Sequence, residues 1–218
     1  MQSTSFLANR EPLDALCHHF SLAKASFPAN TPLPSTLDMH LIAPASRLPT
    51  HILAILPAED KPHVPPLLVP VDAFLYHQTF DSAAFVPQLP PGTPPPTPHL
   101  DPASQRPALA LPVVPVHAPH ALSLPLLLLF GAGLETDSNL LAARILPPDV
   151  IGEFPNAAAM ATVMSRLPEG PFQFYLMLNH GLWKNTLALA PRDTALVELV
   201  RITYKVVADA RRLRMRRW

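Results

Sequence analysis

Residues 108–134 read ALALPVVPVHAPHALSLPLLLLFGAGL, and this stretch decides the fold class. Its first nine residues, ALALPVVPV, are typical of a short strand. The segment SLPLLLLFGAG then predicts a buried helix, with Ser123 as N-cap, Pro125 in the first turn and Gly131 or Gly133 at the end. A strand that runs directly into a core helix indicates a domain of mixed secondary structure.

The same stretch contains no acidic or basic residue, which raises the alternative of a membrane span. Its continuous apolar run, residues 124–134, is only about half of the ~20 residues needed to cross a bilayer. We therefore expect a core helix and no membrane segment. The stretch also holds several helix-breaking residues: Pro112, Pro115, Pro119 and Pro125.

Upstream of this stretch, prolines divide the chain into short pieces. Twenty-four of the thirty prolines lie in residues 1–125, so long helices are expected only in the second half. The segments TLDMHLIA (36–43) and THILAILPA (50–58) predict two strands, which PASRLP would join as a hairpin. Residues 67–71 contain a proline and predict an edge strand, after which the pattern becomes helical at Asp72.

Downstream, the spacing of apolar residues is helical. Helices are expected over residues 137–146, after a cap at Asn156, over residues 171–189, and from Pro191 towards the end of the chain. Strands and short helices followed by a helical stack predict an α+β fold, with the helices collected at one side. The last helix has its apolar repeat at Leu196, Val200, Thr203, Val207 and Ala210.

These patterns predict one domain with appendages. Residues 87–107 are proline-rich, with seven prolines among the twelve residues 87–98, and indicate a semi-rigid linker or, alternatively, a ligand for an SH3 or WW domain. The expected parts are an N-terminal arm (1–30), a strand and short-helix part (31–86), this proline-rich loop or insert (87–107), the helical part of the same domain (108–210) and a basic tail (211–218).

Charge and cysteine content bear on the compartment. The net charge is zero, but residues 1–191 carry eight basic and thirteen acidic residues, whereas residues 192–218 carry eight basic and three acidic ones. The single cysteine, Cys17, cannot form an internal disulfide, and the N-terminus does not resemble a secretory signal. We expect a protein of the nucleus or cytoplasm that is not secreted.

The segment LNHGLWKNTLALAPRD (178–193) places His180, Lys184 and Asp193 close together, which raises the question of a catalytic cluster. A general base needs a nucleophile within hydrogen-bond reach, and no serine or cysteine lies between residues 168 and 218. We instead predict a joint between two helices. In it Gly181 permits a bend, Trp183 fills space and Asp193 caps the next helix.

No metal or cofactor is predicted. His117 and His120 have a His-x-x-His spacing, but Pro119 between them disfavours the helix that would align them on a metal. No glycine-rich phosphate loop or nucleophile elbow is present in the sequence. An enzyme remains as an alternative, in which the fold would gather dispersed residues: His77, Asp81, His117, His120 and His180.

The arginine-rich end is the strongest electrostatic feature. It is typical of a solvated helix end, of a nuclear-import signal or of a contact with nucleic acid or an acidic partner, and these alternatives stay open. A nucleic-acid contact would make the chain an accessory protein. The residues concerned are Arg211, Arg212, Arg214, Arg216 and Arg217.

Two family resemblances point in one direction. LLVPVDAFLYHQTFDSAAF (67–85) resembles the strand-to-helix opening of BTB/POZ domains, although Asp72 and Ala73 stand where members often carry a histidine–lysine pair. LPLLLLFGAGLET, NLLAARILP, EFPNAAAMATVMSRLP, NHGLWKN and the block from DTALVELV to ADARRLR resemble the conserved half of a basidiomycete fungal family, the clampless-type regulators of sexual development. Both resemblances imply protein–protein contact, and the fungal family implies an intracellular, non-enzymatic regulator that acts through partners. We therefore expect a regulatory or scaffolding protein, for which the apolar helix faces also allow self-association.

Overall fold

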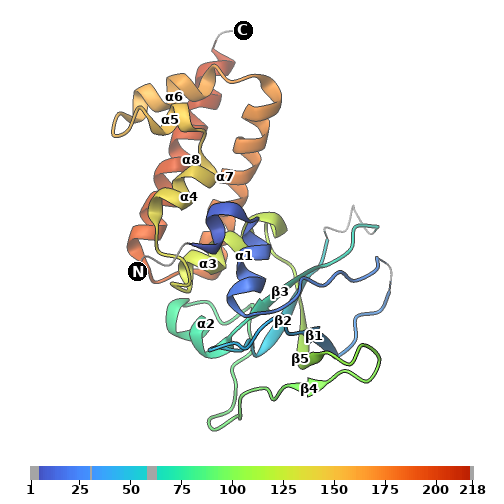
Figure 1. Ribbon diagram of the computed structural model, residues 1–218. Coiled ribbons are helices and arrows are strands. Elements are labelled where there is room, and N and C mark those ends of the chain that lie inside the picture. Colours follow the sequence, from blue (N-terminus) through green and yellow to red (C-terminus); the bar gives the residue numbers. More distant parts are fainter. Residues whose placement is uncertain (1–4, 30, 58–62, 217–218) are drawn as a thin grey trace.

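The computed structural model describes residues 5–29, 31–57 and 63–216, and it has an α+β fold, which confirms the predicted class. A small mixed sheet occupies one end of the molecule, and the long helices extend away from it at the other end (Figure 1). The strands are β1 (Thr36–His40), β2 (His51–Ile55), β3 (Leu67–Val71), β4 (His99–Leu100) and β5 (Pro107–Val116).

β5 organises the sheet, whose strand order is β1-β5-β2-β3. Its first half pairs antiparallel with β1 and its second half, residues 113–116, pairs parallel with β2. β2 and β3 form an antiparallel pair, and β4 pairs with the start of β5. β3 contains Pro70, which has no N–H to donate, and it lies at the edge as predicted.

The predicted hairpin between the first two strands is wrong, because β5 lies between β1 and β2. The connection over residues 41–50 is long enough to pass the end of β5, and β5 brings apolar residues to both neighbours. Leu109 and Leu111 of β5 are fully buried, as is every residue of β2 from Ile52 to Ile55. Pairing with a distant strand therefore replaces the local hairpin.

The helices fall into short elements near the sheet and a stack beyond it. α3 lies centrally, and all eight of its residues are buried, as expected for a core helix. The bounds are α1 (Pro12–His19), α2 (Ala73–Thr79), α3 (Leu124–Gly131), α4 (Ser138–Ile145), α5 (Pro148–Ile151), α6 (Ala157–Ser165), α7 (Glu169–Leu189) and α8 (Thr194–Met215), with 3-10 turns η1 (Phe6–Asn9) and η2 (Ala121–Ser123).

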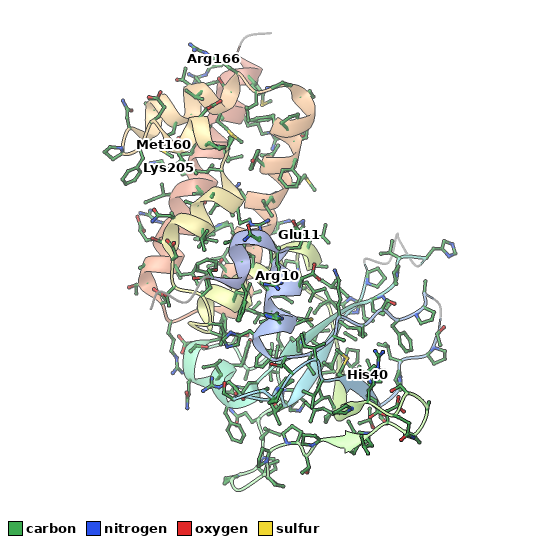
Figure 2. The ribbon with its side chains drawn as sticks, viewed as in Figure 1. Arg10, Glu11, His40, Met160, Arg166 and Lys205 are labelled. Atoms are coloured by element: carbon green, nitrogen blue, oxygen red, sulfur yellow. The ribbon has the colours of Figure 1, made fainter. Side chains whose placement is uncertain are left out.

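The N-terminal arm packs onto the domain. α1 contacts α3 and β3, and it buries Leu13, Leu16 and Cys17. Arg10 and Glu11, at the start of α1, lie between the sheet and the helical stack (Figure 2). Arg144 of α4 donates a hydrogen bond to the carbonyl of Leu7 at 2.9 Å and thereby fastens the arm to the helices.

The proline-rich segment runs along the surface. Most of its residues are exposed, and β4 is its only regular element among the described residues. Together with α2, the segment forms the crossover that the parallel pairing of β2 and β5 requires. The proline-rich segment is therefore part of the crossover connection between β2 and β5.

The predicted helix joint lies later in the chain than expected. α7 continues without interruption through Gly181 and Trp183, and the chain turns only at Ala190, which has a left-handed conformation with φ of 52°. Asp193 caps α8, accepting hydrogen bonds from the backbone N–H groups of residues 195 and 196. The expected bend at Gly181 is wrong, because the helix is continuous there. The missing side chain of Gly181 instead allows a close approach of His120, described below.

Candidate interaction surface on the last two helices

α7 carries few charged residues for a helix at a protein surface. Among its 21 residues, Glu169 and Lys184 are the only members of the Asp, Glu, Lys and Arg group. Phe172, Leu182 and Leu189 are buried on its inner side.

The outward side of α7 nevertheless carries large exposed apolar side chains. Phe174 is 60% exposed, Met177 59% and Leu187 62%. Their spacing places them on one side of the helix together with the exposed His180 and Lys184. Grouped apolar exposure of this kind marks interaction surfaces. We call these five residues the α7 outer face.

A groove of about 300 Å³ runs beside this face, between α7 and α8. Because α7 and α8 pack against each other, their side chains form its two walls. We call it the α7–α8 groove. It is lined by Leu176, His180, Tyr204, Val207, Ala208, Arg211, Arg212 and Met215.

Aromatic rings stiffen one end of the α7–α8 groove. The ring of Tyr204 stacks on Trp183, with centroids 5.8 Å apart and planes at 21°, and on His180, at 6.1 Å and 30°. All three side chains are partly or fully exposed. Stacked rings hold few rotamers, so this wall is already ordered before any partner binds.

The rim of the α7–α8 groove is basic. Arg212 is paired with Asp209 at 2.8 Å, one turn earlier on α8. Within the described part of the chain, Arg211 and Lys184 have no ion-pair partner. No acidic residue lines the groove. Lys205 lies on the other side of α8, near Met160 of α6 (Figure 2).

The predicted basic tail, residues 211–218, is helical over its first five residues, which belong to α8. α8 extends through Arg211, Arg212 and Arg214 to Met215, and Arg216 is exposed at its end, whereas Arg217 lies outside the described residues. The side chain of Arg214 points back onto the domain. It donates hydrogen bonds to the carbonyls of Ser165 (3.2 Å) and Leu167 (2.7 Å) and forms an ion pair with Glu169.

Arg214 also covers the ring of Phe172, with its guanidinium carbon 4.4 Å from the ring centroid. These contacts fasten the end of α8 to the turn between α6 and α7. The donors of Arg214 are thus used within the domain, and its part in a partner-binding or nuclear-import tail stays a prediction. Arg211 and Arg216 are exposed at the surface, as is Arg212, which pairs with Asp209.

The histidines and aspartate of the enzyme alternative lie in different environments. Nε2 of His77 is 3.3 Å from the carbonyl oxygen of Pro87, and Asp81 forms an ion pair with Arg192 at 2.7 Å. His117 is exposed, and His180 stacks on Tyr204 as described above. In the described residues no group of three His, Cys, Asp or Glu side chains is placed to hold a metal ion.

His120 is the one of these residues that lies beside a hydroxyl. Its Nδ1 is 2.9 Å from Oγ of Ser123, and burial lowers the pKa of His120. Ser123 is only 1% exposed and also accepts a hydrogen bond from Asn185 at 3.0 Å. A substrate cannot reach a hydroxyl enclosed in this way, so the pair acts as a structural contact between η2 and α7.

Gly181 makes that contact possible. A Cβ atom added at Gly181 would lie 2.2 Å from the ring of His120, which is far inside van der Waals contact. The sequence offered no signal for this role, because the two residues are 61 positions apart. Cys17 is likewise structural, since burial raises the pKa of its thiol to about 11 and keeps it protonated.

A second hollow of about 450 Å³ lies between α4 and α8. Its rim includes Glu135, Asp193 and Glu198. Each of these carboxylates already has a partner, since Glu135 and Asp193 accept backbone N–H groups and Glu198 binds Arg201. This hollow therefore offers less unused hydrogen-bonding capacity than the α7–α8 groove.

Across the described residues, no helix combines the length and the apolar character needed to cross a membrane. Comparison with known proteins is negative at each level: no family model, no curated protein and no solved structure matches this chain. The resemblances to BTB/POZ domains and to clampless-type regulators therefore stay predictions.

Proposed function

We propose that this chain is a non-enzymatic intracellular regulatory or scaffolding protein that binds a protein partner through the α7 outer face and the α7–α8 groove. The observation that carries the proposal is the grouped exposure of Phe174, Met177 and Leu187 on one side of α7. Their contact with water is unfavourable, and covering them with a partner's apolar residues would remove that cost.

The surface also has the composition of a protein interface. Apolar and aromatic side chains form its centre, and arginines stand at its edge, as at many interfaces. The stacked wall of Tyr204, Trp183 and His180 is ordered in the free chain, which reduces the entropy lost on binding.

We place this activity in the nucleus or cytoplasm, and the resemblance to clampless-type regulators suggests fungal development as the process served. A nucleic-acid accessory role is a weaker candidate, because Arg214 is engaged within the domain. That engagement reduces the number of arginines available to contact phosphates.

Affinity capture from nuclease-treated native extract tests the proposal. The full chain would be compared with a Phe174→Lys/Met177→Lys variant and with a Gln88→Lys/Ser104→Lys variant, in which both positions are exposed but remote from α7. We expect the α7 variant to lose a stoichiometric protein partner that the wild type and the control variant retain. Equal capture by all three proteins would exclude the α7 outer face as the binding surface.

A further inference from the structure

We infer that the partner segment bound in the α7–α8 groove is an acidic amphipathic helix. The inference rests on the proposed function and specifies the chemistry of the partner at the same surface. It follows from the shape of the groove, from the apolar residues at its base and from the sign of the charge along its rim.

The groove has the dimensions of a helix-binding site. Its lining residues on α8 extend from Tyr204 to Met215, which at ~1.5 Å per residue is about 16 Å, or three helical turns. A helix of that length presents apolar residues at positions i, i+3 or i+4, and i+7 on one side. Such a stripe matches a linear groove between two parallel ridges.

The base of the groove accepts large apolar side chains. The small side chain of Ala208 lines the groove together with Leu176 and Val207 and leaves room for a larger residue. Met215, 69% exposed, can adapt its flexible side chain around an inserted residue. The rigid aromatic wall stands at the other end, at Tyr204. A leucine or aromatic side chain from the partner would fill this space.

The charge of the rim specifies an acidic partner. Arg211 lines the groove, and Lys184 lies one turn beyond His180 on α7, outside the lining at the other end. Neither cation has an ion-pair partner within the described residues. The nearest carboxylates are engaged: Asp209 binds Arg212, and Glu169 binds Arg214 and Gln173. Carboxylates on both flanks of the partner's apolar stripe would therefore meet unpaired cations.

Two other occupants fit less well. A second copy of this chain that used the same surface in a two-fold arrangement would place the Arg211 and Lys184 cations of both copies close together. A nucleic acid would gain phosphate contacts at the rim but would leave the apolar base of the groove unfilled. Only a helix with both apolar and acidic faces satisfies both features.

A display selection with the full chain tests the inference. The library consists of sixteen-residue helical peptides with a fixed leucine stripe, in which every flanking position encodes either Glu or Lys. We expect enrichment of peptides with glutamate at the flanks and a net negative charge. Enrichment of lysine-rich peptides, no preference between Glu and Lys, or no enrichment at all would overturn the inference.

Binding of the selected peptides then locates the site. We expect Arg211→Glu to raise the Kd at least about tenfold, because it replaces attraction by repulsion at the rim. Lys205→Glu makes the same charge change on the other side of α8 and should alter the Kd less than about twofold. In a Trp218→Phe background, the fluorescence of Trp183 should change on binding, since its ring is stacked on Tyr204 in the groove wall.

Equal effects of the Arg211 and Lys205 variants would show non-specific charge attraction and would overturn the assignment to the groove. Competition by a nucleic-acid oligonucleotide at a lower concentration than the peptide would also overturn the assignment to the groove.

Failure of this inference is distinguishable from failure of the proposed function. If no acidic peptide binds but Phe174→Lys/Met177→Lys still abolishes capture of the partner, the proposed function stands and only the acidic helix is excluded.

Discussion

The side chain of Asn185 holds the main chain of His120 by two hydrogen bonds. Its Nδ2 donates to the carbonyl of His120 at 2.7 Å, and its Oδ1 accepts from the backbone N–H of His120 at 3.1 Å. The same Nδ2 also donates to Oγ of Ser123 at 3.0 Å. His120 follows β5 and the fully buried Asn185 lies on α7, so this contact joins the sheet to the helical stack.

Replacing Asn185 should therefore weaken the whole domain. Asn185→Ala leaves the backbone groups of His120 without partners in a buried position, and we expect a loss of about 2 kcal/mol in the free energy of unfolding. Urea denaturation followed by circular dichroism measures this loss. Asn139→Ala, at an exposed helical position, should change stability by less than about 0.5 kcal/mol. Similar values for both variants would contradict the role given to Asn185.

Gly181 should be sensitive to a single methyl group. Alanine normally stabilises a helix by about 1 kcal/mol relative to glycine, but here its Cβ would overlap the ring of His120. Overpacking of this kind costs about 1–3 kcal/mol, so Gly181→Ala should be destabilising. Gly170→Ala, where an added Cβ meets nothing within 4 Å, should be neutral or stabilising.

A double variant checks the cause of the Gly181 effect. If the clash with His120 is responsible, Gly181→Ala should cost much less when it is introduced into a His120→Ala background. An unchanged cost in that background would show that the glycine acts through another contact.

Substitution of Arg214 should lower the stability of the chain more than substitution of Arg216. Arg214→Ala removes two hydrogen bonds to carbonyl groups and the contact with Phe172, and we expect a loss of about 2 kcal/mol in thermodynamic stability. Arg216→Ala removes an exposed side chain and should change stability by less than about 0.5 kcal/mol. Urea denaturation of the two variants measures both changes. Equal losses of stability in the two variants would contradict the structural role of Arg214.

The stability should fall as the pH drops below about 6.5. Burial lowers the pKa of His19, His51 and His120 in the folded chain, with smaller contributions from Arg47 at His19 and from His77 at His51. The unfolded chain therefore takes up protons at a higher pH than the folded chain. The stabilisation is complete above the unfolded value near 6.5 and is lost as the pH falls through the folded values.

Urea denaturation between pH 8 and pH 5.5 measures this dependence. His51→Gln should reduce the slope of stability against pH, because it removes one of the three buried histidines, whatever its effect on stability at pH 8. A slope that is the same in the variant and the wild type would contradict the contribution of His51.

Much of the fold follows from local sequence signals. The caps Asp137, Asn156 and Asp193 each have a side-chain oxygen followed by an apolar helical pattern, and each begins a helix in the structure. The core helix at 124–131 is equally clear, because eight consecutive small or apolar residues follow a turn. Such signals depend only on residues within one or two turns of each other.

The features that could not be predicted depend on residues far apart in the chain. β5 enters between β1 and β2 although residues 41–106 separate it from β1 and residues 56–106 from β2, so the local hairpin pattern was misleading. Gly181 suggests a bend until the ring of His120 is seen beside it. Arg214 belongs to a uniformly basic segment, and its carbonyl partners at Ser165 and Leu167 leave no pattern in the sequence.

The candidate surface was missed for a related reason. Phe174, Met177 and Leu187 have the spacing of a buried helix face, and α7 has apolar residues on more than one side. The sequence alone does not show which of these sides the rest of the domain covers. The scarcity of charged residues in α7 was the available signal that its exposed side is apolar.

Site-specific photo-crosslinking tests directly whether α7 binds a protein partner. A benzophenone amino acid would replace Met177 on the α7 outer face or, as a control, Ser104 in the exposed loop before β5, and the chain would be irradiated in nuclease-treated native extract. The account predicts that position 177 crosslinks to one defined protein and position 104 does not. No protein adduct at position 177, or the same adducts at both positions, would contradict the claim that α7 carries the partner-binding surface.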